Sequence, residues 1–303
     1  MIHLFALLSL LLCGVCYTGF QNSSHFHNTS NRRSLLLLVF GGALLLRLLL
    51  AYTTHGFSND IACFAAWADR IFTLGPGQFY SAEMFTDYPP GFMYVLYLIG
   101  ALRSLLQIPY YSDLHILLLK SPAILCDIAC GFLLYREAVK RLHFSDLQGI
   151  FAASAYLFQP AVILNSSCWG QVDSVYTLMI ILMCLFLMKG NLLPAYAVYG
   201  LGVLLKPQML IFTPVLLAGI WDHVFLQDFS WRKFFYNLCG GLVVICGMLL
   251  LCAPFGLTAA ISQYTSTLGS YEYAAINAYN FWGLLGMNWV DQNTIFLFLP
   301  LSL

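Results

Sequence analysis

The chain has 303 residues, of which 60% are hydrophobic and only 9% carry a charge. A soluble domain is closer to about one-quarter charged, so this composition excludes a water-soluble globule and indicates a protein that crosses a membrane several times. Thirteen Lys and Arg residues balance thirteen Asp and Glu residues. Because there is no excess positive charge, the composition argues against nucleic acid as a partner.

Ten apolar runs follow one another along the chain, and a helix that crosses a membrane needs about 20 apolar residues. The runs lie near residues 2–19, 34–52, 91–108, 112–135, 148–164, 172–188, 192–205, 207–221, 234–253 and 293–303. We therefore expect an all-α fold, a polytopic membrane helix bundle of about 8–10 membrane segments. With no internal repeat and no linker, the economical interpretation is a single membrane domain over residues 1–303.

The two terminal runs are shorter or less clear than the others. The run 2–19 resembles the apolar part of a signal peptide, but no Lys or Arg precedes it, and we expect a retained membrane helix. The run 293–303 has about half the length needed for a crossing. We therefore expect the chain to be truncated at its C-terminal end.

The ten cysteines do not form the pattern of a disulfide framework. Most of them lie inside apolar runs, where cysteine behaves as a small hydrophobic residue. Only Cys63 and Cys168 fall in expected loops, so a bridge between these two is the one disulfide that the sequence leaves open.

Lys and Arg residues in short loops indicate which loops face the cytoplasm. The basic positions that this rule assigns to the inside are 32–33, 136–141, 189 and 232–233. The segments that then lie outside are about 53–90, 165–173, 206–208 and 254–290. These external segments hold nearly all the polar residues that are candidates for a functional site.

Residues 91–135 must start outside and end inside, yet they contain two apolar runs. An odd number of crossings is needed there. We expect the run 91–108 to be re-entrant or interfacial, which is possible where protein buries the backbone.

The external segment 53–90 predicts an interfacial amphipathic helix, because apolar residues recur at helical spacing from Ile61 to Phe72. Asn59 or Asp60 is expected to cap its N-terminus. The Gly-Pro-Gly sequence at 75–77 is expected to end it, and the two prolines at 89–90 to force an extended turn before the next run.

Two carboxylates in this segment are candidates for a functional site. A charged side chain at the edge of the membrane is energetically unfavourable, so one that is present there often has a function. Asp60 is one, and the plainer interpretation makes it a helix cap worth about 1 kcal/mol. Asp87 is the other, and it is equally consistent with a turn residue that bonds its own backbone.

Further candidates lie later in the chain. Trp169 suits the membrane interface, and Asp173 is placed to begin the next helix near its positive end, or simply to cap it. Lys206 is a lone cation between apolar residues, so it must pair, snorkel to the interface or bind an anion such as a lipid phosphate. Lys120 and Asp127 are two helical turns apart, which predicts an intramembrane ion pair between them, more as a structural pair than as a functional one.

Several short strings occur in a characteristic order. They are Ser-Asn-Asp at 58–60, Trp67, Gly-Gln-Phe-Tyr at 77–80, Asp-Tyr-Pro-Pro at 87–90, Trp-Gly-Gln-Val-Asp at 169–173, Lys-Pro-Gln at 206–208 and Asn-Ala-Tyr-Asn-Phe-Trp at 277–282. In order and in loop placement these strings resemble the GT-C superfamily of integral-membrane glycosyltransferases, which use polyprenyl- or dolichyl-phosphate sugars. The resemblance covers roughly residues 34–290 and implies a GT-C-like fold.

The resemblance implies an inverting transfer of a hexose from a lipid-phosphate sugar to an acceptor on the non-cytoplasmic side. In the dolichol-linked glucosyltransferase branch the acid of the first external loop is the catalytic base, a role that carries over to Asp60. The leaving phosphate needs a positive partner, which we expect in Lys206, together with Lys120. The further residues expected to bind substrate are Asp87, Tyr88, Trp169, Gln171, Asp173 and Gln208.

The same resemblance implies the partners and the location. The external acid is a single Asp in Asn-Asp-Ile rather than a DxD pair, so neither a metal ion nor a cofactor is required. The expected partners are a lipid-phosphate-linked sugar donor, a glycan or lipid acceptor, and membrane lipid. The expected location is the bacterial cytoplasmic membrane, or the endoplasmic reticulum in a eukaryote.

Two alternatives remain open from the sequence. A multi-pass transporter or lipid flippase would carry intramembrane charges near broken helices, which Lys120, Asp127 and Lys206 fit loosely. A subunit that binds a lipid-linked sugar without catalysis is the other. The external amphipathic helix with its single acid favours the enzyme, because a transporter has no special need of it.

Overall fold

The computed structural model describes residues 32–80, 85–227 and 229–269, together with positions 11, 14, 17, 18, 273, 275, 281–291, 295–296 and 299–300. The α-helices in these ranges are α2 (Arg32–Thr53), α3 (Ser58–Leu74), α4 (Pro90–Leu105), α5 (Asp113–Lys140), α6 (Asp146–Leu157), α7 (Pro160–Ile163), α8 (Asp173–Met188), α9 (Leu192–Leu205), α10 (Thr213–Trp221), α11 (Trp231–Cys252), α12 (Leu257–Gly269) and α13 (Phe281–Leu284). A π-helical turn, Leu164–Trp169, follows α7, and a second, Asp222–Leu226, follows α10. Short 3-10 turns cover Pro76–Gln78, Pro207–Phe212 and Ala253–Phe255.

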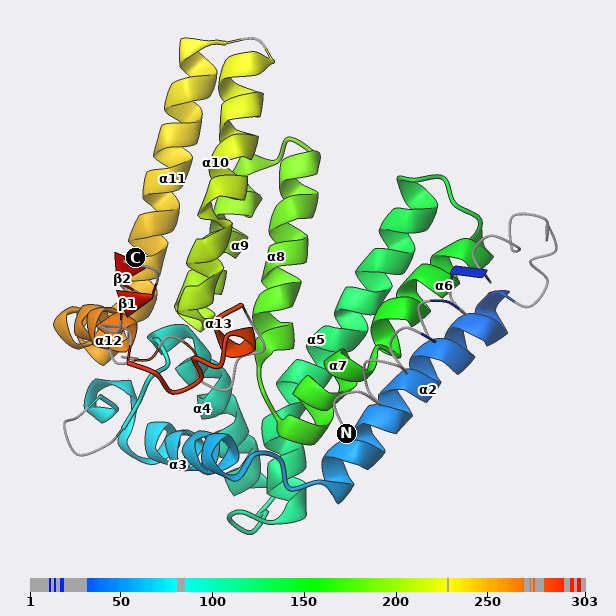
Figure 1. Cartoon of the computed structure of the whole chain (residues 1–303). Helices are drawn as coiled ribbons and strands as arrows, with labels where there is room; N and C mark the ends of the chain where they lie inside the picture. Colours follow the sequence, from blue (N-terminus) through cyan, green and yellow to red (C-terminus); the bar gives the residue numbers. More distant parts are fainter. Residues whose placement is uncertain are drawn as a thin grey trace.

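The all-α fold is confirmed, and the helices form two groups. The helices α2, α5, α6 and α7 form one group, and α8 to α11 form the other, with α5 packed on α8 where the groups meet (Figure 1). The helix α3 lies across one end of the bundle and packs on α4. Two short strands, β1 (Ile295–Phe296) and β2 (Leu299–Pro300), form an antiparallel pair.

Fewer helices are long enough to cross a membrane than the sequence predicts. Four helical stretches in the described residues have the required length and apolarity, and the bent pair α6 and α7 with its π turn gives up to five. The four are Arg32–Thr53, Asp113–Lys140, Pro207–Leu226 and Trp231–Phe255. The helices α4, α8 and α9 are apolar but shorter. The expectation of about 8–10 membrane segments is therefore reduced to four or five long ones.

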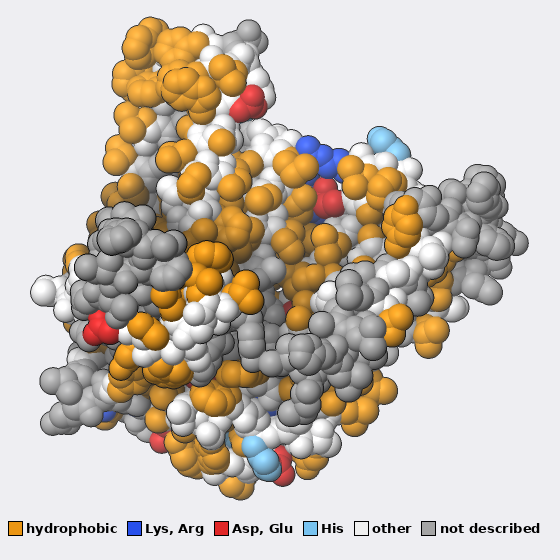
Figure 2. Space-filling model, in the orientation of Figure 1, with side chains coloured by type: hydrophobic (Ala, Val, Ile, Leu, Met, Phe, Trp, Pro, Cys, Tyr) orange, Lys and Arg blue, Asp and Glu red, His pale blue; other side chains and the backbone are white. Residues whose placement is uncertain are grey.

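The surface of the long helices is suited to lipid. Leucines on the outer faces stay exposed, such as Leu37 with 75% of its area and Leu250 with 73%. Hydrophobic side chains also cover much of the face seen in Figure 2, and charged ones are few there. An exposed apolar surface of this extent is costly in water and favourable in a bilayer.

The basic segments that the charge rule groups together do lie together. Arg32 pairs with Asp146 at 3.2 Å, and Lys189 pairs with Glu137 at 3.7 Å. Arg141 donates a hydrogen bond to the carbonyl of Met188 at 3.1 Å. These contacts gather the start of α2, the turn between α5 and α6, and the end of α8 at one end of the bundle, which we call the basic end.

The helix α4 stays at the opposite end. Its first residues touch the end of α9, where a Cβ on Gly91 would lie 2.5 Å from the Leu204 carbonyl oxygen. Near its C-terminus, Arg103 pairs with Asp69 of α3. Both ends of α4 therefore lie away from the basic end, and the re-entrant or interfacial path expected for the run 91–108 stays a prediction.

A buried ion pair joins the first group of helices to α8. Arg47 of α2 donates to Asp127 of α5 at 3.0 Å, and both side chains are fully buried. The Asp127 carboxylate also accepts hydrogen bonds from the hydroxyls of Ser166 at 2.6 Å, Ser174 at 2.5 Å and Tyr156 at 3.3 Å. The predicted pairing of Asp127 with Lys120 is therefore wrong, because Arg47 occupies that carboxylate.

Lys120 points instead to the ends of two helical segments. Its ammonium donates to the carbonyls of Thr54 at 2.7 Å, Ser167 at 2.9 Å and Ala51 at 3.2 Å. These carbonyls lie at helical C-termini, which lack intrahelical donors and attract positive charge. The buried lysine thus holds α2 against the π turn.

Other predictions have mixed outcomes. The helix α3 ends at Leu74 before Gly75, as predicted, but it begins at Ser58, and no side chain caps it. Neither Asn59 nor Asp60 is its N-cap. Cys63 and Cys168 are free thiols, so the bridge is not formed.

The predictions for the two ends of the chain fall largely on residues outside those that the structure describes. The described part of the run 293–303 forms the two short strands rather than a membrane helix. The run 2–19 lies almost entirely outside the described residues, and so do positions 277–280 of the Asn-Ala-Tyr-Asn-Phe-Trp string.

We predict that Arg47→Met destabilises the protein by about 3–5 kcal/mol, because it leaves the Asp127 carboxylate buried without its positive partner. Thermal unfolding in detergent measures this. The double variant Arg47→Met/Asp127→Asn should recover much of the loss, since it removes the unpaired charge. Arg33→Met, at an exposed position near the start of α2, is the control. A single variant as stable as this control would contradict the prediction.

Candidate functional site

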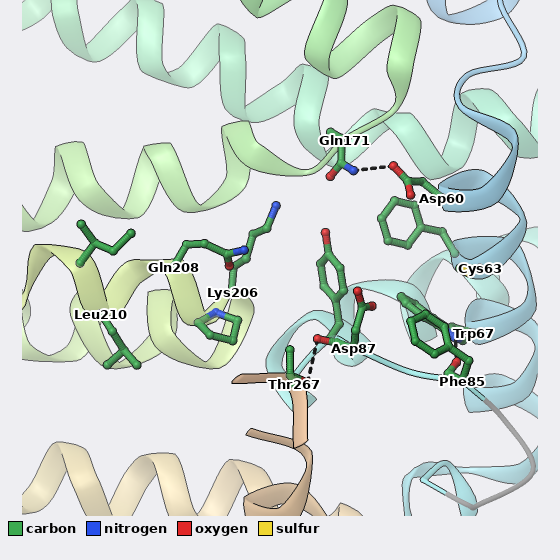
Figure 3. A pocket seen from close by; sticks show the side chains of 14 residues that line it. Asp60, Cys63, Trp67, Phe85, Asp87, Gln171, Lys206, Gln208, Leu210 and Thr267 are labelled. Atoms are coloured by element: carbon green, nitrogen blue, oxygen red, sulfur yellow. Dashed lines mark hydrogen bonds between the residues drawn. The ribbon is translucent and has the colours of Figure 1, made fainter. Parts of the chain in front are cut away.

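The cavity that contains most of the predicted site residues lies at the end of the bundle opposite the basic end. Its volume is about 540 Å³, within the range of about 300–1,000 Å³ typical of small-molecule sites. The labelled side chains come from α3, the two loops before α4 and α8, the turn after α9, and α12, and they surround one space (Figure 3). The lining residues are Asp60, Cys63, Phe64, Trp67, Phe85, Asp87, Tyr88, Gln171, Lys206, Pro207, Gln208, Leu210, Ile211 and Thr267.

One face of α3 forms a wall of the cavity. Asp60, Cys63, Phe64 and Trp67 all line it, and their spacing of i, i+3, i+4 and i+7 puts them on one side of a helix. The three residues after Asp60 were not predicted as site residues. They could have been predicted, because their spacing places them on the same helical face as Asp60.

The Asp60 carboxylate is held by the loop before α8. Its Oδ2 accepts a hydrogen bond from the indole N–H of Trp169 at 2.9 Å and another from the side-chain amide of Gln171. Its Oδ1 accepts no hydrogen bond from the described part of the chain. Asp60 also lies in the first turn of α3, where the helix dipole favours a negative charge. The carboxylate is therefore oriented through one oxygen while the other remains available.

Two glycines allow the loops on either side of Asp60 to approach each other. Gly56 and Gly170 have φ of +79° and +89°, in the left-handed region. A Cβ on Gly56 would lie 2.7 Å from the Trp169 carbonyl oxygen, and one on Gly170 would lie 2.6 Å from the Ile61 side chain. Phe57 donates its N–H to that same carbonyl at 2.9 Å. The two loops are thus locked together, which fixes Trp169 beside α3.

Lys206 is paired, which is one of the outcomes that the sequence leaves open for a cation between apolar residues. Its ammonium bonds to Asp173, and Asp173 in turn accepts a hydrogen bond from Asn165 at 3.0 Å. The ammonium also lies 5.7 Å from the ring centroid of Tyr88 and 5.6 Å from that of Tyr176, within the range of cation–π attraction. Lys206 still lines the cavity. Asp173 begins α8, as predicted, but it binds Lys206 and does not cap the helix.

The loop before α4 is held in place by α12. Gln263 donates to the carbonyl of Thr86 at 2.5 Å and accepts a hydrogen bond from the hydroxyl of Thr86 at 3.2 Å. One turn later, Thr267 donates to the carbonyl of Asp87 at 3.3 Å. Sequence reasoning missed both residues of α12, and the only available signal was their spacing of four residues.

The Cys63 thiol lines the cavity together with the two candidate carboxylates. Burial raises the pKa of this thiol, and the negative charges of Asp87 and then Asp60 raise it further. Asp60 and Asp87 both line the cavity together with this thiol. Burial likewise raises the pKa of Tyr80, whose hydroxyl donates to the carbonyl of Tyr88 at 3.0 Å.

The structure brings most of the predicted site residues to one place. The predicted residues that line the cavity are Asp60, Asp87, Tyr88, Gln171, Lys206 and Gln208. Trp169 and Asp173 lie just behind this lining and bond to it. Lys120 does not line the cavity. It is fully buried behind the loop before α8, and its ammonium is occupied by backbone carbonyls.

In the described residues, no three His, Cys, Asp or Glu side chains lie close enough together to hold a metal ion. Comparisons with protein-family models and with curated proteins find no match for this chain. The functional argument therefore rests on the cavity and on the residues around it.

We predict that Asp87→Asn shifts the alkylation of Cys63 to lower pH. The thiolate is the reactive form, and removing the Asp87 charge lowers the pKa of the thiol. The measurement is the rate of reaction with iodoacetamide against pH, in a variant in which Cys63 is the one remaining cysteine. Equal rates at the high-pH plateau would show that access to the thiol is unchanged. Superimposable pH curves would contradict the prediction.

Proposed function

We propose that the protein is a membrane glycosyltransferase of the GT-C type, which transfers a hexose from a polyprenyl- or dolichyl-phosphate sugar to an acceptor on the non-cytoplasmic side. The observation that carries this proposal is that Asp60 and Lys206, 146 positions apart in the sequence, line the same cavity. One is a carboxylate suited to a base, and the other is a cation suited to a phosphate.

In this reaction the acceptor hydroxyl attacks the anomeric carbon, and the lipid phosphate leaves from the opposite face. Asp60 accepts the proton of the hydroxyl through its available oxygen, while Trp169 and Gln171 hold the other oxygen. This arrangement supports the role of Asp60, because a base must be held within hydrogen-bond reach of the proton that it removes. The phosphate is a good leaving group and needs no general acid.

Lys206 neutralises the charge of the leaving phosphate in this proposal. The ammonium lines the cavity and already binds one carboxylate, that of Asp173. An incoming phosphate shares or replaces that partner, and the rings of Tyr88 and Tyr176 remain beside the charge. Lys120 has no such part, because its ammonium is occupied by carbonyls behind the cavity wall.

The transporter alternative loses its main support. It rested on intramembrane charges at positions 120, 127 and 206. In the structure Asp127 is occupied by Arg47 and three hydroxyls, and Lys120 by carbonyls. These two charges hold helices together, and neither lines the cavity.

We predict that Asp60→Asn lowers the rate of sugar transfer by about 10²–10⁴-fold, the range expected on loss of a general base. The assay uses membranes that contain the protein and a panel of polyprenyl-phosphate hexoses. Asp69→Asn is the matched control, because Asp69 lies on the same helix but pairs with Arg103 away from the cavity. Transfer by Asp60→Asn at the rate of this control would sink the proposed base.

We predict that Lys206→Met raises the KM for the lipid-phosphate donor by about tenfold or more, because it removes the charge that faces the phosphate. Lys206→Arg should retain most of the donor affinity, since it keeps the charge. Steady-state kinetics with varied donor measures both. Donor affinity that is the same in the methionine variant as in the wild type would count against a phosphate at this position.

A further inference from the structure

A second cavity opens between α9, α10 and α11, away from the candidate active site. Its volume is about 400 Å³, and its lining is apolar except for Tyr196, Tyr199 and Asn237. Their polar groups are occupied: Tyr196 donates to Asn237 at 3.3 Å, and the hydroxyls of Tyr199 and Thr213 bond to each other at 2.5 Å. We call this cavity the apolar groove.

The apolar groove has the length of one leaflet of a bilayer. On α11 its lining runs from Asn237 to Met248, which spans about 16 Å at a rise of about 1.5 Å per residue. One leaflet contributes about 15 Å of hydrocarbon. The groove therefore matches a single hydrocarbon chain that lies along the helices.

At the basic end the apolar groove meets a basic pocket of about 230 Å³. Arg232, Lys233 and His223 line this pocket, and Asn237 lines both cavities, so the two are adjacent. Gly190, at the turn before α9, also lines the pocket. This turn belongs to the basic end, because Lys189 comes directly before Gly190.

The start of α11 favours an anion at this pocket. Arg232 and Lys233 lie in the first turn of the helix, which has no acidic residue, and no side chain caps the N-terminus. Two positive side chains at the positive end of a helix dipole repel it. A bound phosphate offsets that repulsion.

We propose that the apolar groove and the adjacent basic pocket together bind one anionic phospholipid, with its phosphate in the basic pocket and one acyl chain in the apolar groove. The site is separate from the candidate active site and does not depend on the proposed function. The apolar lining selects a lipid over a free phosphate, and the basic pocket selects an anionic headgroup over a neutral one.

The test is a titration of the purified full chain in detergent with phosphatidylglycerol and with phosphatidylcholine, with bound lipid counted by native mass spectrometry. We expect one tightly bound phosphatidylglycerol per chain and much weaker binding of phosphatidylcholine. Arg232→Gln/Lys233→Gln should weaken the binding of phosphatidylglycerol by about 30-fold, as expected for two basic side chains near the membrane surface.

The groove is tested by filling it. Gly241 lines the groove, and an added Cβ there meets no atom within 4 Å, so the side chain of Gly241→Leu has an open start and extends into the space of the acyl chain. We expect phosphatidylglycerol to bind about tenfold more weakly or worse. Gly247→Leu is the matched control, because Gly247 has the same free space on the same helix but lies outside the groove lining. Thermal unfolding without added lipid verifies that both variants fold.

Three results would overturn the proposal. One is phosphatidylglycerol binding in Gly241→Leu that equals the binding in Gly247→Leu. Another is equal affinity for phosphatidylcholine and phosphatidylglycerol. The third is displacement of the lipid by glycerol 3-phosphate at comparable concentration, which would identify a site for free phosphate instead.

Discussion

The buried ion pair between Arg47 and Asp127 is the interaction on which the rest of the structure depends. Its carboxylate also accepts hydrogen bonds from α6, from the π turn and from α8. One charge therefore sets the relative positions of five segments that span residues 47 to 174. A buried carboxylate without its partner is costly, so these segments must assemble together around it.

Three consecutive residues of the π turn connect this buried network to the candidate active site. Asn165 binds Asp173, the partner of Lys206, while Ser166 binds Asp127 and Ser167 accepts from Lys120. The next residues along the chain are those that hold Asp60. The base and the cation of the proposed reaction thus take their positions from the same short turn. The buried charges of Asp127 and Lys120 therefore help to position the residues of the cavity, although neither of them lines it.

Much of this organisation was predictable from local sequence. Apolar runs and the basic loops gave the helices and the two ends of the bundle, and Gly75 gave the end of α3. Partners across long separations were not predictable. The spacing of seven residues favoured Lys120 for Asp127, whereas the actual partner, Arg47, is 80 positions away. The part played by α12 was missed for the same reason, because Gln263 bonds to Thr86 at 177 positions.

The π-helical turn has a consequence for chain length. Successive residues of a helix are rotated by about 100°, so loss or gain of one residue between Pro160 and Asn165 would turn all three anchoring side chains away from their partners. A substitution there removes one contact, but a change of register removes every contact at once. This stretch should therefore accept changes of residue type far more readily than insertions or deletions, whereas exposed loops elsewhere should accept both.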